Sequence, residues 1–224
     1  PQSKTTVTEA FCAFIVSRQA QGVTRQTLAY YRGKLHPFIT HCEQSHILTV
    51  DQVTAGSVRA YLVSLQGRGL APYTVHGAAR AIWAFLRFCA ADGLMDAAPV
   101  FAMPKLPKKI LPAFEPSDID RLLDACLFTR DRVAVLVLVD TGLRAAEVCA
   151  LDGGDIDERS GAVLVRLGKG QKARTVYLGA RSRRELARFW RTERRPAANR
   201  PVWVSETTGD RLTDSGLRQM LKRL

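Results

Sequence analysis

The chain has 224 residues, of which 46% are hydrophobic and 24% charged, a composition typical of a globular protein rather than a disordered one. No apolar run approaches the roughly 18 residues that span a bilayer, and the first ten residues lack the apolar segment of a secretion signal. Five cysteines are scattered without a CxxC pair, so we expect reduced thiols in a cytoplasmic protein that does not bind a membrane. The net charge of +12 predicts a polyanionic partner, with nucleic acid as the first candidate.

Residues 1–95 have the pattern of four helices that pack as a bundle, because apolar residues recur there at helical spacing. The four segments are expected to begin near Thr6, Thr24, Thr54 and Pro72. Thr6 and Glu9 have the spacing of a capping box, and Pro37 is expected to kink the second helix. The apolar stripes predict a core and indicate no chemistry.

A proline-rich stretch over residues 96–116 separates this bundle from the rest of the chain. It holds five of the ten prolines and three lysines, including Lys105. Proline favours extended backbone, so the stretch is predicted to be a linker. A basic linker can follow a DNA backbone, and the alternative is a plain spacer.

Residues 117–224 predict a second, mainly helical domain with a small antiparallel sheet. Ser117 is expected to cap its first helix. The apolar run that starts at Val133 fits a buried strand or a helix, and a helix from about Asp131 is favoured because Thr141 and Gly142 form a stop signal after it. The other expected elements are a hairpin over 161–179 with Tyr177 in the core, a helix over 182–194, an extended piece over 202–213 and a helix from Asp214.

Arg144 directly follows that stop signal and is expected on the first turn of a short helix. With Glu147 at i+3 it can form an ordinary salt bridge worth about 0.3–0.5 kcal/mol. An arginine near a helix N-terminus is unfavourable unless an anion is present, and a guanidinium can hold two phosphate oxygens at once. Both interpretations stay open at this point.

Most of the excess positive charge lies between Arg159 and Arg200, a stretch with thirteen lysines and arginines and two acidic residues. This stretch is a solvated basic face or a surface for a polyanion. Within it, the segment Gly168–Arg174 lacks the spacing of a P-loop. Lys169 at the expected hairpin tip is a solvated turn residue or a proton donor that enters a DNA groove.

A metal site is not expected. All four histidines lie in the first half of the chain and do not repeat on one helix face. The carboxylates of Asp152, Asp155 and Asp157 are close in sequence but lack a metal-ligand pattern.

Three motifs in the second half resemble the tyrosine recombinases, which include phage integrases and Xer-type recombinases. They are DTGLRAAEVCAL, GDID and GKGQKARTVYL, in that order. The segments GVTRQTLAYYRGKLHPF and YTVHGAARAIWAFLRFCAADG are similar to helices of the family's core-binding domain. The resemblance implies a four-helix SAM-like core-binding domain and the N-terminal part of the family's catalytic domain, arranged as a C-shaped clamp on duplex DNA.

The same resemblance implies roles for individual residues. Arg144 would be a catalytic arginine that stabilises charge on the phosphate, Glu147 would support it, and Lys169 would protonate the departing 5′-oxygen. A tyrosine would form a 3′-phosphotyrosyl link, so neither metal nor nucleotide cofactor is needed. The whole protein would assemble as a tetramer on two DNA sites. The positions expected to contact DNA are Arg25, Arg32, Lys34, Arg80, Lys105, Lys172 and Arg174.

The chain departs from the family pattern near its end. The family's distal His-x-x-Arg box and nucleophilic tyrosine are expected beyond residue 224, because no histidine follows His76 and Tyr177 is the one tyrosine after Tyr73. We therefore expect a fragment that does not cleave DNA by itself. Two alternatives are a non-catalytic duplex-DNA-binding module derived from the same fold and an unrelated basic RNA-binding protein.

Overall fold

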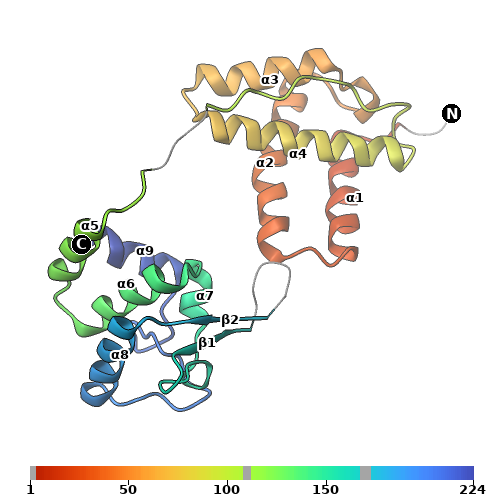
Figure 1. The fold of residues 1–224 in the computed structure, drawn as a ribbon. Coiled ribbons are helices and arrows are strands. Elements are labelled where there is room, and N and C mark those ends of the chain that lie inside the picture. The colour runs from red at the N-terminus through yellow and green to blue at the C-terminus, as the bar shows by residue number, and fades with distance from the viewer. Residues whose placement is uncertain (1–3, 108–111, 167–172) are drawn as a thin grey trace. The chain divides into compact units, whose positions relative to one another are not determined.

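The computed structural model describes residues 4–107, 112–166 and 173–224 (Figure 1). The chain forms two compact units, divided between Ile110 and Leu111, and each unit has its own hydrophobic core. None of the helices in the described ranges is both long and apolar enough to cross a membrane.

The first unit is the predicted four-helix bundle. Its elements are α1 (Val7–Ala20), α2 (Arg25–Gln44), a short 3-10 turn (Val50–Gln52), α3 (Ala55–Gly67) and α4 (Pro72–Ala91). The predicted capping box opens α1, since Thr6 N donates to Glu9 Oε2 at 2.8 Å and Glu9 N donates to Thr6 Oγ1 at 3.1 Å. Helix α2 continues through Pro37.

Aromatic rings fill the centre of the bundle. Phe14 of α1 is fully buried and meets Tyr31, Phe85 and Phe88 edge to face, with ring centroids 5.0, 5.8 and 5.5 Å apart. Such pairs add to the apolar burial that holds α1, α2 and α4 together. The predicted apolar stripes therefore form one core.

The first part of the predicted linker packs on this unit. Phe101 is buried in the bundle core, Pro104 O lies 2.9 Å from His76 Nδ1, and Tyr73 Oη donates to Pro107 O at 3.3 Å. Figure 1 shows this segment running alongside α4. The backbone up to residue 107 is thus anchored, and Lys105 is exposed on it.

The second unit is mainly helical with one two-stranded antiparallel sheet, as predicted. Its elements are α5 (Pro116–Ala125), α6 (Thr129–Thr141), α7 (Ala145–Ala150), a 3-10 turn (Gly153–Asp155), β1 (Ala162–Val165), β2 (Arg174–Tyr177), α8 (Ala180–Thr192) and α9 (Asp214–Arg223). The run from Val133 is a helix, and Val133 and Val137 are fully buried in the core that α6 shares with α8. Gly142 ends α6 in the left-handed conformation with φ 59°.

Three sequence predictions for this unit are wrong. Helix α5 is capped by Glu115 rather than Ser117, because Pro116 takes the first helical position and the carboxylate of Asp118 accepts Glu115 N at 3.0 Å. Tyr177 is 65% exposed, because strand alternation turns Val176 toward the core and Tyr177 to the other face. The stretch 202–213 is a turn closed by a bridge between Val204 and Arg211, not an extended piece.

Candidate functional site

The turn after α6 places Arg144 at the start of α7. Thr141 Oγ1 donates to Val137 O at 2.5 Å and accepts from Leu143 N at 3.4 Å, and the left-handed Gly142 reverses the chain. Leu143 is then buried in the core at 5% exposure. The next residue, Arg144, has extended backbone and is the N-cap of α7. It therefore lies one position before the first turn on which the sequence placed it.

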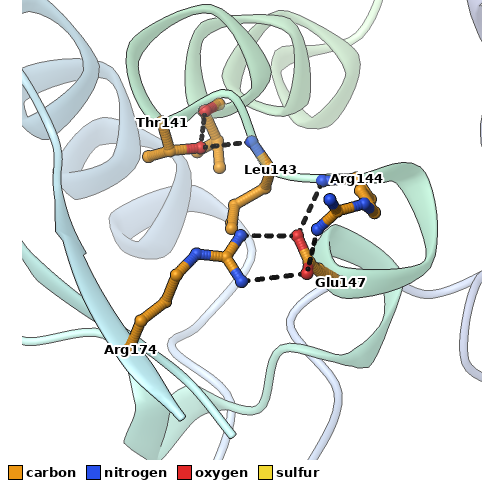
Figure 2. Close-up of polar contacts among 6 residues, drawn as sticks. Thr141, Leu143, Arg144, Glu147 and Arg174 are labelled. Atoms are coloured by element: carbon orange, nitrogen blue, oxygen red, sulfur yellow. Dashed lines mark hydrogen bonds and ion pairs between the residues drawn. The ribbon is translucent and has the colours of Figure 1, made fainter. Parts of the chain in front are cut away.

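Glu147 fixes Arg144 in this position. Its Oε2 accepts the backbone N–H of Arg144 at 2.9 Å, and its Oε1 accepts Arg144 Nη1 at 3.0 Å (Figure 2). The predicted i,i+3 ion pair is thus present. The Arg144 side chain is nevertheless 60% exposed, and Nη1 is the one guanidinium nitrogen with a hydrogen bond to the described residues. The rest of the guanidinium is available to an anion.

Arg174 is a second arginine on the same carboxylate. Its Nη1 donates to Glu147 Oε1 at 3.0 Å and its Nη2 to Oε2 at 2.7 Å, a bidentate arrangement that fixes the guanidinium plane. Arg174 is the first residue of β2, so Glu147 joins the β-hairpin to α7 (Figure 2). The sequence predicted Arg174 as a DNA contact and gave no sign of this pairing, because the two residues are far apart in the chain.

These contacts determine the ionisation of Glu147. Its hydrogen bonds to Arg174, followed by those to the backbone and side chain of Arg144, lower the pKa of the carboxyl group from 4.5 to about 2, although burial opposes this. Glu147 is 7% exposed. The site is therefore a buried carboxylate, ionised at neutral pH, that holds two arginines side by side.

The two hairpin lysines of the sequence prediction, Lys169 and Lys172, lie outside the described residues. The structure describes the strands on either side of them, whose ends Val165 and Arg174 pair across the sheet. Since Arg174 is bound to Glu147, the described part of the hairpin is anchored beside Arg144.

The predicted DNA contacts of the first unit lie on α2, on α4 and on the segment after α4. Arg25, Arg32, Arg80 and Lys105 are exposed and Lys34 is half-buried.

Helices α2 and α4 approach closely at Gly77. Tyr30 Oη donates to Gly77 O at 2.7 Å, and a Cβ on Gly77 would lie 3.5 Å from Lys34 Cε. The side chain of Lys34 on α2 therefore lies close to α4 at Gly77. Tyr30 was not among the predicted site residues; the signal available for it was Gly77 inside a helix, where a glycine can have a packing role.

Two of the three aspartates after α7 are neutralised by arginines. Arg211 Nη2 lies 2.6 Å from Asp152 Oδ1, and Arg166 Nε lies 2.6 Å from Asp155 Oδ1. Within the described part of the chain, no three His, Cys, Asp or Glu side chains gather as a possible metal site. The expectation that no cofactor is needed stays a prediction.

Residues 112–224 match the Phage integrase family. The chain belongs to this family of tyrosine recombinases. The match covers the whole described part of the second unit, including Arg144, Glu147 and Arg174.

Two relatives extend the similarity into the first unit. The tyrosine recombinase XerD of Mycobacterium tuberculosis is 34% identical over 177 residues, which cover 71% of this chain and 57% of XerD. The tyrosine recombinase XerC of Xanthomonas campestris pv. campestris is 30% identical over 208 residues, which cover 90% of this chain and 63% of that relative. The chain thus spans less than two thirds of the length of these relatives.

The fold is that of solved integrases. A lambda integrase tetramer bound to a Holliday junction superposes with a TM-score of 0.80 at 14% identity, covering 99% of this chain and 64% of the integrase. A lambda integrase dimer bound to a COC′ core site gives a TM-score of 0.75 at 16% identity, covering 97% of this chain and 63% of the integrase. These likenesses confirm the predicted fold class.

Proposed function

We propose that the protein acts in site-specific DNA recombination or integration, by cutting and rejoining strands through a 3′-phosphotyrosyl intermediate. The observation that carries the proposal is the buried Glu147 carboxylate with Arg144 and Arg174 on it, in a chain of the tyrosine recombinase family. Arg144 is the catalytic arginine, Lys169 the general acid, and Glu147 a positioning residue.

In the proposed reaction the oxygen of a deprotonated tyrosine attacks a DNA phosphorus, the bond to the 5′-oxygen breaks, and that oxygen takes a proton from Lys169. Negative charge builds on the non-bridging oxygens, and a guanidinium already held in place can stabilise it without reorganising. Glu147 supplies this preorganisation because it binds Arg144 through both the backbone and one Nη. The free edge of Arg144 then faces the phosphate.

The proposed partner is duplex DNA. In the first unit, Lys34 and Arg80 from two crossing helices, with Arg25, Arg32 and Lys105, would contact the phosphate backbone. A solved lambda integrase is a tetramer on a Holliday junction, and we propose self-association on DNA for the whole protein. We further propose that the nucleophilic tyrosine is not among the 224 residues.

A nicked suicide substrate, which traps the phosphotyrosyl protein, tests the proposal. The whole protein should form a covalent DNA adduct, and its Arg144→Ala variant should form the adduct about 10²–10³ times more slowly. The 224-residue chain alone should form none.

Tyr177 provides the control, because it is 65% exposed and thus accessible to DNA. A Tyr177→Phe variant of the whole protein should react like the parent. An adduct on Tyr177, or no adduct with the whole protein on any site to which it binds, would contradict the proposal. The second outcome would favour the non-catalytic DNA-binding module.

A further inference from the structure

Helix α8 carries a line of arginines on its exposed side. Arg184, Arg188 and Arg191 are spaced by four and three residues, which places them on one helix face, and all three are exposed. We call them the α8 stripe. The opposite face of the helix, with Leu186 and Phe189, is buried in the core of the second unit.

No acidic side chain of the described residues neutralises the arginines of the stripe. Arg181, one turn earlier, binds Asp120 of α5 at 2.8 Å, but no member of the stripe forms an ion pair with any of the described residues. Glu185 is three positions before Arg188, yet its Oε1 lies toward Arg132, 4.0 Å away. No acidic residue occupies the first turn of the helix.

Such an arrangement is unfavourable for the isolated protein. Like charges one helical turn apart repel each other and destabilise a helix. The attraction between the stripe and an anionic surface laid against it offsets this repulsion. A second copy of this chain is a poor candidate, because its own net charge is +12.

The spacing of the stripe fits a phosphate backbone. Arg191 is seven positions after Arg184, and at about 1.5 Å rise per residue the stripe is roughly 10 Å long. One strand of duplex DNA carries a phosphate about every 3.4 Å along the axis. The stripe therefore spans about three phosphate steps of one strand, and each of its guanidinium groups can bind two phosphate oxygens.

The stripe is separate from the candidate active site. Arg174 begins β2 beside Glu147, whereas α8 follows the other end of that strand, as Figure 1 shows. From Arg174 to Arg184 the chain runs along β2 and then into the second turn of α8. A phosphate bound at Arg144 and the phosphates bound at the stripe would thus be different phosphates.

We propose that the α8 stripe is a second contact surface for duplex DNA, which binds the phosphate backbone without reading its sequence. The choice of duplex DNA as the polyanion rests on the proposed function. The stripe itself has no part in strand cleavage, and its arginines are neither catalytic nor positioning residues for the reaction.

The test measures the affinity of the 224-residue chain for a random-sequence duplex at several salt concentrations. A stripe triple variant, Arg184→Gln, Arg188→Gln and Arg191→Gln, is compared with a charge-matched triple variant on α5 and α9, Arg121→Gln, Arg218→Gln and Lys222→Gln. Both variants lose three positive charges from exposed positions. Each phosphate contact contributes about 0.9 to the slope of log affinity against log salt, so the stripe variant should lower that slope by about two to three.

The charge-matched variant should keep a slope within about one of the parent. A lysine version of the stripe should restore the slope, because it keeps the charges. Thermal unfolding by circular dichroism should show the stripe variant to be at least as stable as the parent.

Two results overturn the proposal while leaving the proposed function intact: an unchanged slope in the stripe variant, or equal losses in both triple variants. In the first case an acidic protein surface becomes the partner of the stripe. A parent chain that binds no duplex DNA at any salt concentration overturns the stripe proposal and the proposed function together.

Discussion

The geometry of the site depends on Glu147, whose carboxylate binds both arginines. It is 7% exposed and accepts four hydrogen bonds, one from a backbone N–H and three from guanidinium groups. The arginine side chains that bind it are 60% and 36% exposed, so loss of the carboxylate charge weakens these charge-assisted hydrogen bonds without leaving a buried charge. Glu147 therefore affects both the stability of the second unit and the position of Arg144.

We predict that Glu147→Gln lowers the free energy of unfolding of the second unit by about 3 kcal/mol at pH 7, which is the free energy that corresponds to the lowered pKa of the carboxyl group. Tryptophan fluorescence during urea unfolding measures this loss. A Trp83→Phe background leaves Trp190 and Trp203, both in the second unit, as the reporting groups. Asp120→Asn, which breaks the exposed pair with Arg181, is the control and should cost no more than about 0.5 kcal/mol.

The loss in Glu147→Gln should also depend on pH. The pKa of Glu147 is lowered in the folded chain to about 2 from 4.5, so its stabilising contribution is complete above the unfolded pKa and disappears as the pH falls toward 2. At pH 3.5 the difference between parent and variant should be smaller by about 1 kcal/mol. A difference that grows on acidification would show that the carboxylate is not held ionised by the arginines.

Of the two arginine contacts of Glu147, sequence spacing could predict the one with Arg144 but not the one with Arg174. Arg144 and Glu147 are neighbours on a short helix, and local spacing is enough to pair them. Arg174 is brought to the same carboxylate by the pairing of β1 with β2, which is a tertiary contact. A pattern in the sequence carries no information on that contact.

At the scale of elements, the turn between α6 and α7 determines where Arg144 lies. Gly142 has φ 59°, and a Cβ added to it would meet no atom within 4 Å. Any penalty for a side chain there arises from the left-handed backbone alone, not from a clash.

We predict that Gly142→Ala destabilises the second unit by about 1–2 kcal/mol, measured by urea unfolding in the Trp83→Phe background. Gly142→Asn should cost less, because asparagine tolerates the left-handed region. Equal losses in the two variants would mean that backbone strain is not the cause.

The ends of helices were predictable where contacts between residues close in the sequence determine them. The capping box at Thr6 and the stop signal at Gly142 involve neighbouring residues, and both are present in the structure. The cap at Ser117 was wrong because the fixed φ of Pro116 suits the first helical position, which moves the cap to Glu115. The core assignment of Tyr177 was wrong because an apolar strand pattern does not reveal which face of a two-stranded sheet is covered.

At the scale of the whole molecule, the net charge of the chain predicts how its affinity for the proposed partner, duplex DNA, depends on salt. We predict that affinity for random-sequence duplex falls more than about tenfold between 50 and 200 mM salt, because several phosphates are contacted and counterions are released. Fluorescence anisotropy of a labelled duplex measures this change. A salt-independent affinity would contradict a phosphate-backbone interface.

The domain organisation was predictable only in outline. Prolines identified the stretch 96–116 as a connection, but the contacts of Phe101, Pro104 and Pro107 with the bundle depend on tertiary packing. Prolines remove backbone donors without preventing such packing. The predicted limits of the two domains and of the linker therefore stay predictions, whereas the division into two units is a feature of the structure.

The proposed division of labour between Arg144 and Lys169 can be measured directly in the whole protein. Single-turnover cleavage is followed for Arg144→Ala and Lys169→Ala on normal DNA and on DNA with a 5′-bridging phosphorothiolate, whose sulfur leaving group needs no proton. If Lys169 is the general acid and Arg144 stabilises charge on the phosphate, the sulfur substrate restores cleavage by Lys169→Ala and leaves Arg144→Ala about 10²–10³ times slower than the parent. Full rescue of Arg144→Ala, or a Lys169→Ala variant as active as the parent on normal DNA, would contradict these roles.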